Sequence, residues 1–259
     1  MELGIAGRVA LVSGASRGMG KAIAHSLARE GVLVTMVARR PAVLNAAAAE
    51  IHAATGAQVT AVAADITIEA GRAAALAACP APDILVTNAG GPAPGDFREW
   101  SREDWLRAID GLMLTPIELI KATLDGMVAR RFGRVLNIAS RGVKIAAPEL
   151  GLSNGARSGL VGVVAGLARQ VVMHGVTINN LLPGPFDTDG QREHIEGLVS
   201  RSGRGFEDIR AERTRATPAG RFGRPEEIGD YAAFLCSAQA GFITGQNLLI
   251  DGGAYPGTY

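Results

Sequence analysis

Residues 13–20 read Ser13-Gly14-Ala15-Ser16-Arg17-Gly18-Met19-Gly20, after a short apolar run and before an amphipathic stretch over residues 21–30. Glycines let backbone N–H groups approach a pyrophosphate without a Cβ clash, and a helix that starts at the turn adds partial positive charge beneath it. The order strand, glycine turn, helix is the context that a phosphate-binding turn requires. A Gly-rich turn without a ligand is the alternative. We predict a nucleotide site whose phosphate-binding residues are Gly14, Ser16, Arg17, Gly18, Met19 and Gly20.

Seven short apolar or β-branched runs alternate with longer Ala-rich or amphipathic stretches along the chain. The runs cover residues 9–12, 33–37, 59–63, 84–87, 134–138, 176–181 and 247–250. Strands separated by helices of this length form right-handed βαβ crossovers, which cover both faces of a parallel sheet. The pattern predicts an α/β, doubly wound Rossmann fold, with a seven-stranded, mostly parallel sheet and helices on both faces.

The chain has 259 residues, of which 47% are hydrophobic, and a formal net charge of +1. This length and composition predict a single domain over residues 1–259, large enough for a full core. No repeat or linker divides it. The least regular part, residues 183–217, follows a predicted strand and is predicted to form a mobile lid over the site from about residue 184.

Composition also limits the partners. Charges of both signs are interspersed, so no nucleic-acid footprint is indicated, and no run of about 18 apolar residues or secretion signal is present. Cys79 and Cys236 are too few for a disulfide framework and are predicted to be buried, and the histidines show no metal-like spacing. We expect a cytoplasmic protein without a metal, whose partners are a small-molecule substrate and copies of itself.

The end of the second strand indicates which nucleotide binds. About 20 residues beyond the glycine turn, an NAD-preferring site places a carboxylate to hold the ribose 2′-hydroxyl. Here the sequence reads Val37-Ala38-Arg39-Arg40, without a carboxylate. Arg39 together with Arg17 would hold a 2′-phosphate, so NADP(H) is favoured over NAD(H). The alternative is that these arginines are solvated surface charges.

These features resemble the short-chain dehydrogenase/reductase family. The glycine turn is similar to its T-G-x-x-x-G-x-G motif, with Ser13 in place of Thr, and residues 87–90, Thr-Asn-Ala-Gly, match its N-N-A-G motif except at the first position. The similarity extends over essentially the whole chain, including residues 223–227, and is greatest to the β-ketoacyl-ACP reductase-like branch. The resemblance implies further cofactor contacts from Asp65, Ile66, Asn88, Ala89, Gly90, Pro183, Gly184 and Thr188.

The same resemblance implies an oxidoreductase that acts on a carbonyl/alcohol pair and assembles as a homotetramer. Residues 106–128 and 158–172 read as apolar, Gly- and Ala-rich helices that would pack against their symmetry mates, and residues 242–246 resemble a second interface. The alternative buries these faces within one subunit.

The catalytic residues depart from the family pattern. Ser140 occupies the position of the substrate-orienting serine. In relatives a Tyr follows 13 residues later and a Lys four residues after that, but here these positions hold Ser153 and Arg157. Leu112 stands where the helix before them usually holds an Asn. No tyrosine elsewhere is followed by a lysine four residues later, so the Tyr-x-x-x-Lys pair is absent from this chain.

This departure changes the acid–base chemistry. A phenol with a pKa near 10 can donate a proton at neutral pH when an ammonium lies beside it, whereas a serine hydroxyl is far less acidic. Arg157 keeps the positive charge, but an ordinary guanidinium pKa above 12 prevents it from relaying protons. Lys144, or less directly Arg141 or Glu149, is a candidate for the missing acid.

Three hypotheses follow. The first is an NADP(H)-dependent oxidoreductase in which Ser140, Ser153 and Arg157 form the catalytic site and the proton comes from water, Lys144 or the substrate. The second is a cofactor-binding member without ordinary redox turnover, such as an isomerase, a lyase or a regulatory subunit. The third, a structural partner without a ligand, conflicts with the intact nucleotide motifs. The sequence favours the first and does not identify the substrate.

Overall fold

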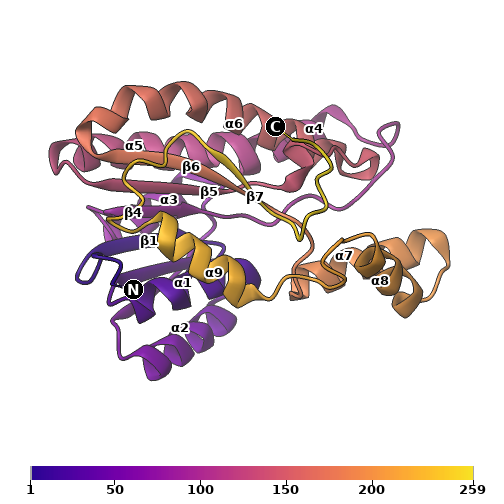
Figure 1. Cartoon of the computed structure of the whole chain (residues 1–259), viewed down its shortest axis with the longest axis horizontal. Coiled ribbons are helices and arrows are strands. Elements are labelled where there is room, and N and C mark those ends of the chain that lie inside the picture. Colours follow the sequence, from indigo (N-terminus) through magenta and orange to yellow (C-terminus); the bar gives the residue numbers. More distant parts are fainter. Residues whose placement is uncertain (1, 259) are drawn as a thin grey trace.

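The computed structural model describes residues 2–258 and has a seven-stranded sheet at its centre (Figure 1). The strand order is β3-β2-β1-β4-β5-β6-β7, and every neighbouring pair is parallel. The predicted doubly wound fold and all seven predicted strands are confirmed. The strands are β1 (Val9–Ser13), β2 (Leu33–Ala38), β3 (Val59–Ala63), β4 (Ile84–Thr87), β5 (Gly133–Ile138), β6 (Val176–Pro183) and β7 (Asn247–Ile250).

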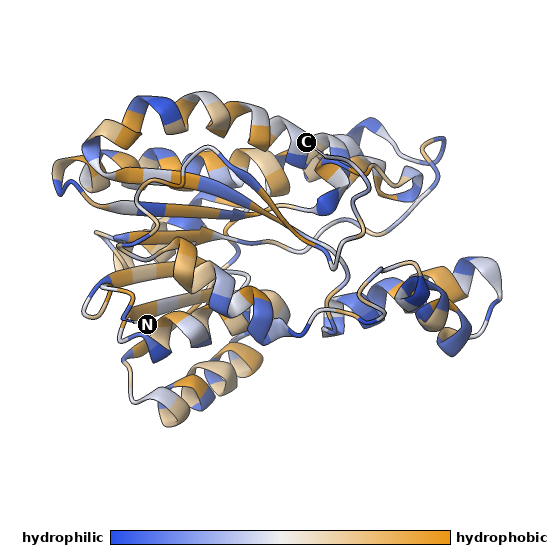
Figure 2. Ribbon diagram, viewed as in Figure 1, coloured by the Kyte–Doolittle hydropathy of each residue, from blue (hydrophilic) through white to orange (hydrophobic). Residues whose placement is uncertain are grey.

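Helices cover both faces of the sheet. One face packs on α1 (Gly18–Arg29), α2 (Pro41–Thr55) and α9 (Pro225–Leu235). The other packs on α3 (Glu69–Ala78), α5 (Thr115–Ala129) and α6 (Gly151–Val171), with α4 (Arg102–Ile109) beside α6. Figure 2 shows the apolar strands between these two layers. Because both faces are covered, the strands are apolar throughout, and this is why they could be recognised from short apolar runs.

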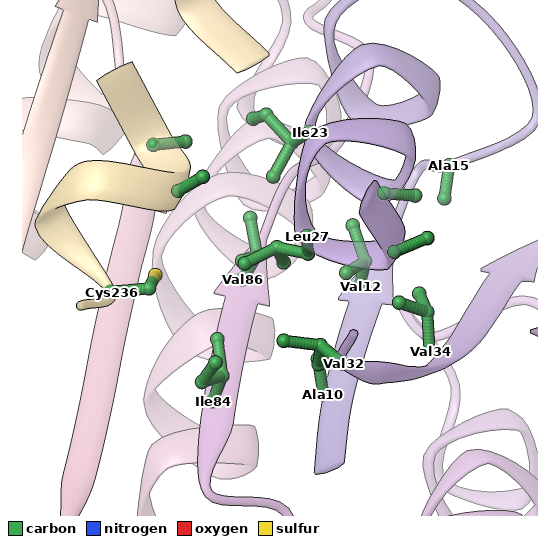
Figure 3. Close-up of a cluster of buried hydrophobic side chains, with 14 of the residues drawn as sticks. Ala10, Val12, Ala15, Ile23, Leu27, Val32, Val34, Ile84, Val86 and Cys236 are labelled. Atoms are coloured by element: carbon green, nitrogen blue, oxygen red, sulfur yellow. The ribbon is translucent and has the colours of Figure 1, made fainter. Parts of the chain in front are cut away.

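The core beneath α1 shows how the helix is fixed to the sheet (Figure 3). Ile23 and Leu27, four residues apart on one helix face, point at Val12 of β1 and Val86 of β4. Cys236, just after α9, contributes its thiol to the same cluster. Both cysteines are buried, as predicted, and desolvation raises the pKa of Cys236 to about 12, so this thiol is a packing group.

A ladder of polar side chains crosses four strands. Thr87 Oγ1 donates to Asn137 Oδ1 at 2.7 Å, Asn137 Nδ2 to Asn180 Oδ1 at 3.0 Å, and Asn180 Nδ2 to Asn247 Oδ1 at 2.8 Å. These residues are also register partners along β4, β5, β6 and β7. The ladder satisfies polar groups inside the sheet and fixes the relative height of the strands whose carboxyl ends carry the site.

The segment after β6 is more regular than predicted. It contains α7 (Asp189–Ser202) and α8 (Phe206–Arg215), which extend to one side of the sheet in Figure 1. Thr188 caps α7 by accepting a hydrogen bond from Gln191 N, and Gly203, with φ of +67°, ends it. The sequence pattern did not predict these helices because they bury few apolar side chains. Their small core consists of Ile195, Ile209 and Phe222. We call residues 184–217 the lid; its mobility stays a prediction.

Residues 2–258 contain neither a membrane-spanning helix nor a cluster of metal ligands. No helix there has the length and apolarity to cross a membrane. No group of three or more His, Cys, Asp or Glu side chains there is arranged to hold a metal ion.

Candidate functional site

The glycine turn between β1 and α1 has the shape of a phosphate cradle. Gly14 and Gly18 have φ angles of +59° and +56°, which favour glycine. A Cβ on Gly20 would collide with the carbonyl oxygen of Gly14. Arg17 precedes the first residue of α1, and its side chain does not cap the helix N-terminus. The first N–H groups of α1, which starts three residues earlier than predicted, are therefore available to an anion.

Asn88 joins the end of β4 to this turn. The Ser13 hydroxyl donates to Asn88 O and accepts from Asn88 N, both at 2.9 Å, and Asn88 Nδ2 donates to Gly14 O at 3.1 Å. A Cβ on Gly14 would lie 2.6 Å from Asn88 O. Asn88 therefore fixes the geometry of the glycine turn through hydrogen bonds within the protein.

Arg17 connects the glycine turn to the lid. Its guanidinium lies 2.5 Å from the Glu193 carboxylate and 4.0 Å from that of Asp189, both on α7. The hydrogen bond from Arg17, assisted by the charge of Arg40, holds the pKa of Glu193 below its usual range. Arg40 thus lies on the Arg17 side of the site, a placement that the sequence reasoning did not foresee.

Arg39 lies instead toward the end of β3. It is exposed, and its charge acts on Asp65. Desolvation raises the pKa of Asp65, but hydrogen bonds from the Thr67 N–H (3.0 Å) and hydroxyl (2.8 Å), together with Arg39, outweigh it and lower the pKa overall. Arg39 and Asp65 therefore lie close enough for their charges to interact. Their predicted roles, at a 2′-phosphate and at the adenine, stay predictions.

Ser140 begins the loop after β5. Its Oγ accepts the N–H of Gly142 at 3.0 Å, which leaves the hydroxyl hydrogen free to donate. A Cβ on Gly142 would lie 3.2 Å from Ser140 Oγ and would collide with Asn154 Oδ1, so Ser140 and Asn154 flank the same glycine. Asn154 Nδ2 donates to Ala147 O at 2.9 Å, and its Oδ1 is buried without a partner. The sequence reasoning missed Asn154.

Ser153 and Arg157 lie side by side on α6. Each is 8% exposed, and Arg157 Nε donates to Ser153 Oγ at 3.2 Å. The two terminal nitrogens of Arg157 donate to Ile138 O at 2.5 Å and to Ala89 O at 3.4 Å. The guanidinium therefore joins the carboxyl ends of β4 and β5 to α6, and the two residues that replace the family pair form one hydrogen-bonded unit.

The charge of Arg157 has no counter-ion. Within residues 2–258 its hydrogen-bond partners are two carbonyls and a hydroxyl, and none is a carboxylate. Desolvation by burial lowers the pKa of Arg157 to about 10, so the guanidinium is charged at neutral pH but more acidic than the sequence suggested. A buried, unneutralised cation costs stability, and such groups cluster at functional sites.

A small cavity opens beside Arg157. It is bounded by Leu112 and Thr115, among others, and the Thr115 hydroxyl is buried there without a hydrogen-bond partner. Residues 110–114 form a π-helical turn between α4 and α5, where the sequence predicted one continuous helix. Such a turn contains an additional residue and changes which side chains face α6. Leu112 does line the site, as predicted, and Thr115 supplies a hydroxyl that the sequence reasoning missed.

The three candidate replacement acids have no hydrogen bond to Ser153 or Arg157 within residues 2–258. Lys144 is exposed, with its ammonium 5.2 Å from the centre of the Tyr255 ring, and contacts neither Ser153 nor Arg157. Arg141 and Glu149 are half-buried, and both act electrostatically on Arg213 of the lid. None of the three lies within hydrogen-bonding distance of Ser153 among the described contacts.

Comparisons with known proteins show which proteins the whole chain resembles. Residues 14–255 match the family model described as enoyl-(acyl carrier protein) reductase. The chain is 35% identical over 260 residues to the 3-oxoacyl-[acyl-carrier-protein] reductase FabG of Vibrio harveyi (98% of this chain, 99% of the relative). It is 34% identical over 257 residues to gluconate 5-dehydrogenase of Gluconobacter oxydans (96% and 95%). The solved structure of L-sorbose reductase from Gluconobacter frateurii, complexed with NADPH and L-sorbose, superposes with a TM-score of 0.93 at 28% identity (99% and 100%).

Proposed function

The chain belongs to the short-chain dehydrogenase/reductase family, and we propose that it is an NADP(H)-dependent oxidoreductase that interconverts a carbonyl and an alcohol. In this proposal Ser140 keeps the family's serine position, and Ser153 and Arg157 take the places of the usual Tyr and Lys. The observation that carries it is the buried Arg157 guanidinium, which has no counter-ion and donates to Ser153 beside the end of β5. Burying this charge reduces the stability of the fold. A negative charge that develops beside it during the reaction would explain why a cation is present at this end of the sheet.

Two observations support NADP(H) as the cofactor. The glycine cradle and the uncapped N-terminus of α1 fit a pyrophosphate. Arg39, with no carboxylate at the position after β2, fits a 2′-phosphate. The related L-sorbose reductase was solved with NADPH. The remaining cofactor contacts of the proposal are Ser16, Met19, Ile66, Ala89, Gly90, Pro183, Gly184 and Thr188.

The chain's own residues would polarise the substrate and supply the proton. A bound reduced nicotinamide supplies the hydride that reaches the carbonyl carbon. Ser140 donates a hydrogen bond to the carbonyl oxygen, and Ser153, whose oxygen accepts from Arg157, directs its own O–H at the same atom. The positive charge of Arg157 stabilises the alkoxide that forms. The alkoxide takes the Ser153 proton, and a proton from water restores the Ser153 hydroxyl, while Arg157 stays charged throughout.

A turnover assay tests this proposal. NADPH oxidation is followed at saturating NADPH with L-sorbose, 5-keto-D-gluconate and an acetoacetyl thioester. We expect wild-type turnover with at least one ketone and a loss of about 100-fold in Ser153→Ala, because a positioned proton donor contributes that much. Ser158→Ala, an exposed serine on the same helix, is the matched control. NADPH binding without oxidation by any ketone contradicts the proposal and supports a member without redox turnover.

We also propose that the protein is a homotetramer. Leu106 and Leu114, around α4 and the π-helical turn, are 51% and 44% exposed, and Val163 on α6 is 44% exposed. Phe242, in the predicted second interface, is fully exposed. Large apolar side chains exposed at both predicted interfaces favour burial against another subunit. Light scattering at micromolar concentration tests this, and a monomer mass contradicts it.

A further inference from the structure

Three nitrogen atoms of the lid are buried without hydrogen-bond partners in residues 2–258. They are Gln191 Nε2 and His194 Nε2 on α7 and Arg213 Nε on α8. Leaving a buried donor unpaired costs about 1–3 kcal/mol, and most buried polar groups in native proteins are paired. Three such atoms in one small lid therefore indicate a polar partner that belongs there.

The charge around Arg213 is not balanced. Two carboxylates act on it, those of Glu149 and Glu212, but neither forms an ion pair with it within 4.0 Å, and Glu212 pairs with Arg204 at 2.5 Å. A second cation, Arg141, faces it from the loop after β5. Burial, with this repulsion, lowers the pKa of Arg213. The half-buried guanidinium therefore lies near a like charge and forms no ion pair within residues 2–258.

The neighbourhood of His194 contains the same groups. Burial first, and then the charges of Arg213 and Arg201, lower the pKa of His194 to about 4, against the opposing effect of Glu149. The imidazole is therefore neutral at physiological pH, so it adds a hydrogen-bonding group to the cluster and no charge.

This cluster adjoins the reacting end of the site. Arg141 directly follows Ser140 and begins the short turn whose Gly142 N–H donates to Ser140 Oγ. Asn154, whose Oδ1 has no hydrogen-bond partner within residues 2–258, lies against Gly142 on the other side from Ser140 Oγ. A ligand whose carbonyl contacts Ser140 would therefore extend toward Arg141 and the lid.

We propose that the substrate is a keto or hydroxy acid whose carboxylate binds to Arg213, with His194 and Gln191 completing its hydrogen bonds. The inference rests on the proposed function for the position of the reacting carbonyl. A guanidinium matches a carboxylate in geometry and charge. A monoanion fits better than a phosphate dianion, because Glu149 already contributes one negative charge to the cluster. Asn154 Oδ1 accepts from a substrate hydroxyl along the path.

Calorimetry with matched polyols tests the carboxylate site. D-Gluconate and D-glucitol are titrated into the protein in the presence of NADPH. Neither polyol can accept a hydride, so no reaction occurs during the titration. The two molecules differ only in that gluconate has a carboxylate where glucitol has a hydroxymethyl group. We expect gluconate to bind about 30-fold more tightly or better, since removing one partner of a buried charge pair has at least this effect. Arg213→Gln should abolish the difference and leave glucitol binding unchanged. Arg210→Gln, on the same helix and paired with Asp187 at 3.5 Å, should preserve it.

The outcomes separate this inference from the proposed function. Three results would overturn the carboxylate site. They are equal affinity for the two polyols, no binding of gluconate, and an Arg213→Gln variant that loses affinity for gluconate and for glucitol equally. Arg213-dependent gluconate binding without NADPH-dependent reduction of 5-keto-D-gluconate supports the carboxylate site and counts against the oxidoreductase. Reduction of L-sorbose at the same kcat/KM as 5-keto-D-gluconate supports the oxidoreductase and overturns the carboxylate site.

Discussion

The glycine turn after β1 and the Ser153–Arg157 unit on α6 both border the carboxyl ends of the sheet, yet they are built differently. The turn works through its backbone: positive φ angles, a close approach at Gly20 and uncapped N–H groups. The catalytic unit works through side chains on a regular helix. Side chains on a rigid helix can be exchanged without altering the fold, whereas the glycines of the turn cannot. Under the proposed function, this difference allows the chain to keep the nucleotide half of its family while residues 153 and 157 differ from the family pair.

The largest expected effect restores the family pair. Ser153→Tyr with Arg157→Lys should raise the reduction of simple activated ketones by about 100- to 10,000-fold, the contribution of a positioned general acid. NADPH oxidation measures the change. A wild type that is active on its substrate, together with a double variant that is slower than the wild type on the simple ketones as well, would contradict this expectation. Residues 153 and 157 could then not be exchanged independently of the rest of the site.

Disturbing the glycine turn should weaken cofactor binding. In Gly20→Val the new side chain would collide with Gly14 O, and a forced shift of the turn costs about 1–3 kcal/mol, or up to about 100-fold in affinity. Fluorescence titration with NADPH measures this. Gly197→Ala, at a helical position with open space, is the control. Unchanged NADPH affinity in Gly20→Val would show that the cradle does not hold the pyrophosphate.

The nucleotide preference should depend on Arg39. Arg39→Ala should weaken NADPH binding by about tenfold and leave NADH binding unchanged, because one exposed charge-assisted contact contributes about 1–2 kcal/mol. Arg17→Ala and Arg40→Ala should have smaller effects, since Arg17 is already paired with Glu193 and Arg40 lies near the same carboxylate. Parallel titrations with both nucleotides test this. A wild type that prefers NADH would contradict the 2′-phosphate assignment.

The smallest expected effect concerns pH and the lid. His194 has a folded-state pKa of about 4, below its ordinary value of 6.5. The unfolded chain therefore binds a proton at higher pH than the folded chain, so the stability contribution is present above pH 6.5 and is lost as pH falls toward 4. Between pH 7 and pH 5, the Tm of the wild type should fall by about 2 °C more than that of His194→Gln. His52→Gln, on α2, should follow the wild type; equal falls in all three would contradict the burial of His194.

The same contrast explains how much the sequence revealed. The strands and the glycine turn are local patterns, so both were predicted, although Gly18-Met19-Gly20 was read as turn and belongs to α1. The lid helices were missed because few of their residues are buried. No local sequence pattern marks Thr115 or Arg213. The burial of the Thr115 hydroxyl depends on the π-helical turn, and the surroundings of Arg213 depend on Arg141 and Glu149, which are distant in the sequence. The lowered pKa of Arg157 likewise follows from burial, which the sequence does not display.

The central claim is that Arg157 is retained for catalysis at a cost in stability. Because its folded-state pKa of about 10 lies below the ordinary value of a guanidinium, the buried cation disfavours folding at all pH values below 10. The most direct measurement is kcat and Tm together for wild type, Arg157→Met and the exposed control Arg169→Met at pH 7.5. We expect Arg157→Met to lose about 100- to 1,000-fold in kcat, as when an oxyanion donor is removed, without a lower Tm. Full activity in Arg157→Met, or a loss of activity matched by a lower Tm, would contradict the account.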